Sequence, residues 1–289
     1  MYNFRRNVVT KKLYRYVNDL LRPIYLLNTE ETDYADKPSV LVNSFPKSGT
    51  HLLHQIIKGI PDTVDKGNFI ASKPSFTFSE TSPGKIGSRL STLLPGEIVP
   101  SHIHYHESYD SLLKNKNVFS LFIYRDLRDV TISEAHYLSN MNRWHKLSKY
   151  FRSCSHINEA VELSLDGLPT TNPIEYENVA DRFGKYKGWL NSENTMVIKF
   201  EELISKDSEK VLGTIADRYI SVTKNENKLR KDELVRAFKD AFNPGKSHTF
   251  RSGKTKQWKE IYTPEMNMRF EQYLLKNFTE QDILKFKLY

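Results

Sequence analysis

One short segment constrains the fold of this chain more than any other. Apolar residues 40–42 lead into Asn43-Ser44-Phe45-Pro46-Lys47-Ser48-Gly49-Thr50, and five apolar residues at helical spacing follow, namely Leu52, Leu53, Ile56, Ile57 and Ile60. This order predicts a strand, a tight loop and a helix whose first N–H groups point outward without partners. Such a helix start binds anions. Gly49 permits a close backbone approach, Lys47 brings a positive charge, and Ser48 and Thr50 add hydroxyl donors.

The spacing of this loop separates it from the common nucleotide-triphosphatase loop. It is shorter than G-x-x-x-x-G-K-[ST] and lacks the first glycine of that pattern. We therefore expect a phosphate donor other than an ordinary nucleoside triphosphate.

Two further apolar runs predict the rest of a parallel sheet. Residues 118–124 and 195–200 are continuous apolar stretches, typical of strands buried on both faces, and residues 98–102 suit a short strand. Helix-type patterns alternate with these strands, and 289 residues suit one domain. The sequence predicts an α/β fold: a single-domain parallel β-sheet flanked by helices, of the P-loop-containing nucleotide-binding type, over residues 1–289.

The segments outside the sheet are less regular. Residues 1–37 predict a basic helical segment packed on the domain, with its helix ending near Arg22-Pro23. Attachment to a membrane surface is the alternative for this segment. Residues 72–96 have no clear period and predict a long functional loop, which we expect to form the substrate pocket together with residues 138–180. Residues 224–240 and the tail from Pro264 predict helices.

The charge and cysteine content narrow the partners. The net charge is +8, with several basic residues near candidate anion loops, so a multiply charged small molecule is favoured over nucleic acid. No apolar run approaches the ~20 residues of a membrane span, so no integral membrane association is expected. The single cysteine, Cys154, and the lack of a signal-peptide core favour a reducing, cytoplasmic location.

Two more loops have the composition of anion sites. Arg125 ends the second apolar run and Ser133 follows eight residues later, on the first turns of a helix, so both can hold one phosphate. A simple ion pair between Arg125 and Asp129 is the alternative. The third loop is Phe250-Arg251-Ser252-Gly253-Lys254-Thr255-Lys256-Gln257-Trp258-Lys259, for which a solvated basic loop is the alternative.

Taken in order, these segments resemble the signature motifs of the cytosolic-type sulfotransferases, which use 3′-phosphoadenosine 5′-phosphosulfate (PAPS). The motif T-Y-P-K-S-G-T-T-W aligns with residues 44–52. The motif Y-x-R-N-x-x-D-x-x-x-S resembles the segment from Tyr124 to Ser133, which keeps the Arg-to-Ser spacing but has Tyr124 directly before Arg125 and Asp126 in place of the Asn. The motif R-K-G-x-x-G-D-W-K is partly matched from Arg251 to Lys259. Order and spacing agree from about residue 38 to residue 260.

The resemblance implies a role for each matched position. Lys47, Ser48, Gly49 and Thr50 are expected to bind the 5′-phosphosulfate, and Lys47 to stabilise charge on the leaving phosphate. Arg125 and Ser133 are expected to bind the 3′-phosphate. Nucleotide contacts are also expected from His51, Leu52, Phe200, Arg251, Ser252 and Gly253. At three of these positions the residue differs from the family's: His51 replaces a Thr, Leu52 a Trp and Phe200 a Tyr.

The general base is expected to be a histidine. The family's base stands in a K-[TS]-H-L-P segment, and Val99-Pro100-Ser101-His102-Ile103-His104 occupies that place here. His102 is therefore the expected base, with His104 as the alternative. A histidine whose pKa is near neutrality suits removal of a proton from an acceptor hydroxyl.

The implied activity is in-line transfer of the sulfuryl group of PAPS to a hydroxyl or amine of a small molecule, without a metal. The acceptor class stays open between a natural product, a phenol and a sugar, and the oligomeric state is also open. Two alternatives remain: a small-molecule kinase on a related P-loop fold, which predicts dependence on ATP and Mg²⁺, and a non-catalytic nucleotide-binding relative.

Overall fold

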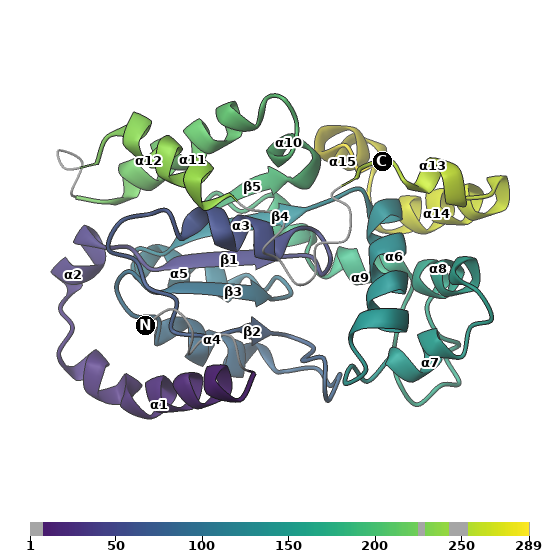
Figure 1. Cartoon of the computed structure of the whole chain (residues 1–289), viewed down its shortest axis with the longest axis horizontal. Helices are drawn as coiled ribbons and strands as arrows, with labels where there is room; N and C mark the ends of the chain where they lie inside the picture. The colour runs from purple at the N-terminus through teal and green to yellow at the C-terminus, as the bar shows by residue number, and fades with distance from the viewer. Residues whose placement is uncertain (1–7, 225–228, 243–253, 289) are drawn as a thin grey trace.

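A five-stranded parallel sheet forms the centre of the molecule (Figure 1). The computed structural model describes residues 8–224, 229–242 and 254–288, without the side chains of residues 8–13 and 15. The strand order is β2-β3-β1-β4-β5, and all four pairings are parallel. The strands are β1 (Val40–Ser44), β2 (Ile70–Ala71), β3 (Ile98–His102), β4 (Phe119–Tyr124) and β5 (Thr195–Lys199). The predicted α/β class is confirmed.

Helices cover both faces of the sheet, and each face has its own core. Val40 and Val42 point into one core with the helices α3 (Thr50–Ile57), α11 (Ser208–Val222) and α12 (Lys231–Ala241). Leu41 points into the other core. The helices that contribute to that second core are α4 (Pro83–Ser91), α5 (Ser108–Asn115), α6 (Leu127–His136), α7 (Ser148–Arg152), α8 (Ile157–Asp166), α9 (Val179–Gly184), α14 (Pro264–Asn277) and α15 (Glu280–Phe286).

The central strands form where the apolar runs predicted them. Every residue of β1 and of β4 is buried, as continuous apolar runs require in a sheet covered on both sides. Strand β2 was not predicted, because a two-residue strand is too short to show a period. Short helical elements complete the chain: α10 (Phe200–Leu203), α13 (Trp258–Ile261), the π-turn Tyr137–Met141 and the 3₁₀ turn Lys187–Leu190.

Residues 72–96 are not the continuous loop that the sequence predicted. The helix α4 occupies Pro83–Ser91, with Pro83 at its first turn, and buries Ile86 and Leu90 one turn apart. Two apolar residues in nine gave too weak a helical period for prediction. The first part of the segment, before α4, is irregular and runs past the cavity described below.

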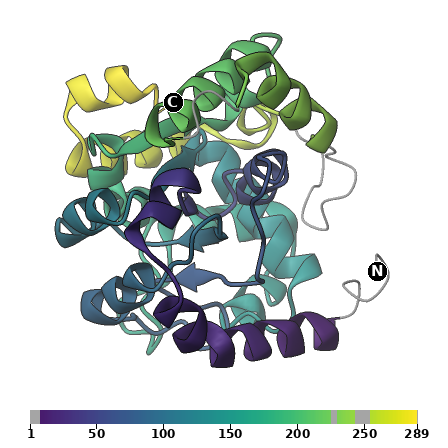
Figure 2. The ribbon, with the colours of Figure 1, turned by 90° about the vertical axis from the view of Figure 1, so that its left-hand side faces the viewer.

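The helix α1 (Val8–Leu27) continues past Pro23, where the sequence predicted its end; α2 (Glu31–Asp36) follows. In Figure 2, α1 lies along the edge of the molecule opposite α11 and α12. Its Arg22 forms a bidentate ion pair with Glu97, at 2.8 and 2.6 Å, whereas Leu20 and Ile24 are exposed. None of the described helices is both long enough and apolar enough to cross a membrane.

Replacement of Arg22 by methionine is expected to destabilise the fold by about 3 kcal/mol, because it leaves the buried carboxylate of Glu97 without its ion-pair partner. Glu97 is fully buried and would keep only the bonds from the Asn68 side chain and the Leu94 N–H. Urea unfolding measures the change. As a control, Lys239→Ala removes an exposed pair with Glu209 and should cost no more than about 0.5 kcal/mol. Equal effects of the two variants would contradict this account.

Candidate active site

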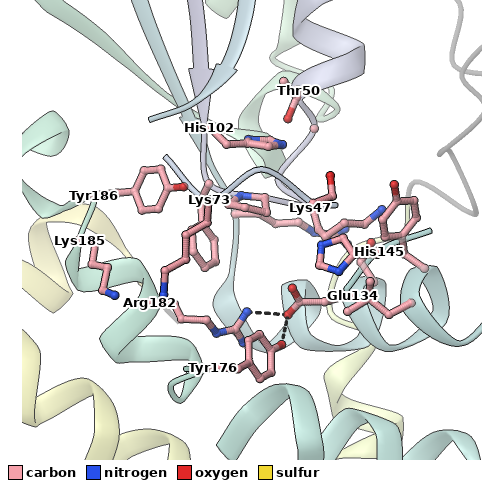
Figure 3. Close-up of a pocket in the computed structure, with 18 of the residues that line it drawn as sticks. Lys47, Thr50, Lys73, His102, Glu134, His145, Tyr176, Arg182, Lys185 and Tyr186 are labelled. Carbon is pink, nitrogen blue, oxygen red and sulfur yellow. Dashed lines mark hydrogen bonds and ion pairs between the residues drawn. The ribbon is translucent and has the colours of Figure 1, made fainter. Parts of the chain in front are cut away.

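A cavity of about 230 Å³ opens at the carboxyl edge of the sheet, where ligands bind in open parallel sheets (Figure 3). The loop after β1, the ends of β3 and β4, and α6 contribute to it, together with segments near residues 73–78, 145 and 175–186. Figure 3 shows Thr50 and His102 toward one end and Glu134, Tyr176 and Arg182 toward the other. Among the predicted site residues, those lining the cavity are Lys47, Gly49, Thr50, His51, Leu52, His102, Arg125, Ser133 and Phe200.

The backbone of the phosphate loop adopts positive φ angles, which most residue types disfavour. Lys47 and Gly49 both have positive φ angles, of 68° and 102°. A Cβ atom added at Gly49 would lie 2.5 Å from the Phe200 ring, so a side chain is excluded there. The loop leads directly into α3, whose first N–H groups have no intrahelical partners. This is the strand–loop–helix arrangement that the sequence predicted.

Replacement of Gly49 by alanine is therefore expected to destabilise the protein by about 2 kcal/mol and to weaken nucleotide binding. The added methyl group meets Phe200 and also forces an L-residue into the left-handed region. Gly84→Ala is the matched control, since no atom lies within 4 Å of its added Cβ. Thermal unfolding and calorimetric titration with adenosine 3′,5′-bisphosphate measure both effects. A Gly49→Ala protein as stable as the control would contradict the predicted clash.

Two hydroxyl groups of the loop differ in how they are satisfied. The Ser48 Oγ is buried and has no hydrogen-bond partner among the described residues. The Thr50 Oγ1 lies 2.6 Å from the Ser44 Oγ, which in turn lies 3.0 Å from the His102 Nδ1. A buried polar atom without a partner is costly unless a ligand satisfies it. The Ser48 hydroxyl thus fits a phosphate or sulfate oxygen.

Lys47 extends from this loop into the cavity. Its Nζ lies 3.8 Å from the centre of the Tyr137 ring, close enough for a cation–π contact. Tyr137 begins the π-turn that follows α6, and its hydroxyl accepts a hydrogen bond from the Asn142 side chain. The lysine charge is therefore held over an aromatic ring inside the cavity.

The tautomer of His102 follows from its hydrogen bonds. Its Nδ1 lies 3.0 Å from the carbonyl oxygen of Ser44, which can only accept, so Nδ1 carries the proton. The Nε2 atom then holds a lone pair and can accept a proton. Burial lowers the pKa of His102 to about 4, although the Ser44 carbonyl opposes this shift. The expectation of a pKa near neutrality is therefore wrong for the protein without its ligands.

His104 lies on the same side of the chain as His102 but has different partners. Its Nδ1 lies 2.8 Å from a carboxylate oxygen of Glu80, and its ring packs edge-on against Tyr186. Burial lowers its pKa to about 4 as well. His106, the third alternating histidine, is exposed and contacts Ser108. His102 is thus the histidine joined to the phosphate loop.

Arg125 and Ser133 both line the cavity, as predicted. Arg125 pairs with Asp129 at 3.2 Å and donates to the Lys254 carbonyl at 2.6 Å, so the ion pair that was the alternative is present. Its guanidinium lies over the Phe200 ring at 4.7 Å, while its buried Nε has no hydrogen-bond partner among the described residues. The arginine therefore keeps hydrogen-bonding capacity beyond that pair.

The third predicted loop is described only in part. Arg251, Ser252 and Gly253 lie outside the described residues. Beyond them, Asp129 accepts hydrogen bonds from the N–H groups of Lys256 and Trp258, and Gln257 lines the cavity. These bonds fasten the end of this loop to the helix that carries Ser133.

The residues of the predicted adenine region lie together. Leu52 and Phe200 are both buried in the core that contains α3 and also line the cavity, and His51 lines it from the exposed side. The sequence had not identified the charged residues at the opposite end, which come from weakly patterned segments. They are Lys73, Glu134, Glu175, Glu177, Arg182 and Lys185. Among the aromatic residues of this region, Tyr137 lines the cavity, whereas Trp144 is exposed.

Acidic, histidine and cysteine side chains do not gather into a metal-binding group anywhere in the described part of the chain. The polar groups of the cavity near the phosphate loop are cations, hydroxyls and histidines, whereas the carboxylates of Glu134, Glu175 and Glu177 line its opposite end (Figure 3). The groups near the loop suit an anionic ligand.

Comparison with known proteins assigns the family. The model of the sulfotransferase domain matches residues 37–282, and the chain therefore belongs to the sulfotransferase domain family. No curated protein sequence matches it.

The fold is similar to that of solved sulfotransferase structures. Mouse sulfotransferase SULT7A1, complexed with PAP, is 21% identical with a TM-score of 0.57, over 88% of this chain and 90% of that one. Retinol dehydratase, in complex with androsterone and the inactive cofactor PAP, is 16% identical with a TM-score of 0.54, over 89% and 85%. Retinol dehydratase in a complex with retinol and PAP is 17% identical, with a TM-score of 0.53, over 89% of this chain and 86% of that one.

Proposed function

We propose that this protein transfers the sulfuryl group of PAPS to a hydroxyl or amine of a small-molecule acceptor. Family membership makes the chain a sulfotransferase and supports sulfuryl transfer in general. The observation that supports the donor is the loop itself: Lys47 lines one cavity with Arg125 and Ser133, and the buried hydroxyl of the next residue, Ser48, has no hydrogen-bond partner in the described part of the chain. The 5′-phosphosulfate of PAPS would bind to Lys47 and Ser48, and its 3′-phosphate would bind to Arg125 and Ser133.

His102 is proposed as the general base. Its Nε2 accepts the proton of the acceptor hydroxyl while that oxygen forms its bond to sulfur. Since Nδ1–H is held by the Ser44 carbonyl, the imidazole has its lone pair on the nitrogen that must act. The bond from sulfur to the phosphate oxygen breaks in the same step, and adenosine 3′,5′-bisphosphate leaves.

Lys47 is proposed to stabilise the leaving group. Charge accumulates on the bridging oxygen as its bond to sulfur lengthens, and a fixed cation beside that oxygen lowers the energy of that state. Thr50 is linked to His102 through Ser44 by short hydrogen bonds. These hydrogen bonds hold the phosphate loop and the proposed base in a fixed position relative to each other.

Calorimetric titration with adenosine 3′,5′-bisphosphate, followed by an assay of its release from PAPS with mixed acceptors, tests the proposal. We expect binding and acceptor-dependent release without added Mg²⁺. Failure to bind the bisphosphate would contradict the proposed function. Transfer from ATP in the presence of Mg²⁺ would instead support the kinase alternative, and binding without turnover would support a non-catalytic relative.

A further inference from the structure

Glu134, on α6, has a buried carboxylate whose two oxygen atoms are used differently. Its Oε2 accepts three hydrogen bonds at 2.7 Å, from the hydroxyls of Ser164 and Tyr176 and from the Arg182 guanidinium. No donor among the described residues forms a hydrogen bond to its Oε1, and the residue lines the cavity. Figure 3 shows one oxygen facing Tyr176 and Arg182 and the other turned away from them.

This carboxylate is ionised and rigid. Burial acts to raise the pKa of Glu134, but Arg182 and the hydrogen bonds to Oε2 hold it below its usual range. Three donors fix the group in one orientation, so Oε1 is a strong, preorganised acceptor of hydrogen bonds. A donor on the bound acceptor molecule is its natural partner.

The charges around Glu134 cancel. In the described part of the cavity wall, three cations at this end face three carboxylates: Lys73, Arg182 and Lys185 against Glu134, Glu175 and Glu177. The pairs lie at 3.2 Å for Lys73–Glu175, 2.7 Å for Arg182–Glu134 and 2.6 Å for Lys185–Glu177. A charged acceptor would find each counter-charge already paired, whereas a neutral molecule keeps the balance.

The same end offers neutral donors and flat rings. His145 accepts the Leu147 N–H at its Nδ1, so its Nε2 carries a proton, and burial lowers its pKa and favours this neutral form. The rings of Phe78, Tyr137 and Tyr176 also line the cavity. Aromatic faces pack against the C–H faces of a saturated ring, while the polar groups between them bond to hydroxyls.

We infer that the acceptor is a neutral polyhydroxylated molecule of the carbohydrate class, and that Glu134 determines this specificity by accepting a hydrogen bond from one of its hydroxyl groups at Oε1. The inference rests on the proposed function and names the substrate class of that same site. A phenol or a steroid would leave the Glu134 Oε1 without a hydrogen-bond partner, at a cost.

The test compares acceptors and variants by the release of adenosine 3′,5′-bisphosphate from PAPS. The panel contains neutral alkyl glycosides, an amino-sugar glycoside, 4-nitrophenol and androsterone. We expect kcat/KM for the best neutral glycoside to exceed that for 4-nitrophenol and androsterone by about tenfold or more. Glu134→Gln should raise KM for the glycoside by about tenfold, with bisphosphate affinity unchanged by calorimetry. Glu162→Gln, which alters an exposed pair with Arg269, should change neither quantity.

A second variant covers the case in which Glu134→Gln does not fold. Lys73→Gln removes one cation from the balanced set, and its partner Glu175 is largely exposed, so folding should survive. This variant should shift the preference from the neutral glycoside toward the amino-sugar glycoside. Higher kcat/KM for 4-nitrophenol or androsterone, an unshifted preference in Lys73→Gln, or no turnover of any acceptor would overturn the inference. Bisphosphate binding reports separately on the proposed function.

Discussion

Replacement of Lys47 by alanine is expected to lower the rate of sulfuryl transfer by about 10³-fold. The lysine lies over the Tyr137 ring in the cavity, and charge that develops on the leaving oxygen would have no other cation of the phosphate loop to stabilise it. The effect should fall mainly on kcat, since the stabilised charge is largest in the transition state. Measurement of kcat and KM for PAPS at a fixed acceptor concentration checks this.

Lys85→Ala is the control for the loss of one positive charge. Lys85 is an exposed residue of α4 outside the cavity, so its removal should leave kcat within about twofold of the unchanged protein. A Lys47→Ala protein with nearly normal kcat and a raised KM would mean that the lysine binds the donor without acting on the transition state.

His102→Ala should lower transfer by about 10³-fold while leaving bisphosphate affinity nearly unchanged. Without ligand, burial holds the pKa of His102 near 4, so its neutral, proton-accepting form persists as the pH falls below 6.5. Consequently kcat/KM for PAPS, which reports the free enzyme, should stay level through pH 6.5 and decline only near pH 4. The negative charge of a bound nucleotide favours the protonated imidazole, so the decline in kcat should come at a higher pH.

His106→Ala is the matched control, because that histidine is exposed and contacts Ser108 away from the cavity. It should leave both pH profiles unchanged. If His102→Ala retained turnover while His104→Ala lost it, the base would be the histidine that pairs with Glu80.

Most of the residues on the donor side of the site could be predicted from the sequence. Strands β1 and β4 are continuous apolar runs, and the loops that follow them must share one edge of a parallel sheet, so Lys47 and Arg125 could be expected to converge. The fold class, the family and the positions of β1, β3, β4 and β5 followed from the sequence, whereas β2 did not. The residues of each loop motif are neighbours in the sequence, so their spacing can be recognised without the structure.

The acceptor side depended on contacts that are distant in the sequence. Glu134 meets Arg182 across 48 residues, and Lys73 meets Glu175 across 102. None of these residues lies in a periodic pattern that marks it as buried or paired. The low pKa of His102 was also unpredictable, because it follows from burial of the imidazole rather than from residue type. Helix α4 was missed because few of its residues are apolar.

The most direct test of the central claim is a single-turnover experiment with PAPS labelled in its sulfuryl group, saturating protein and a mixture of neutral glycosides, phenols and amines. We predict that the label moves to an acceptor as adenosine 3′,5′-bisphosphate appears, and that Lys47→Ala slows both by about 10³-fold. Label that stays on the nucleotide in the unchanged protein, at concentrations where calorimetry shows it bound, would contradict the account.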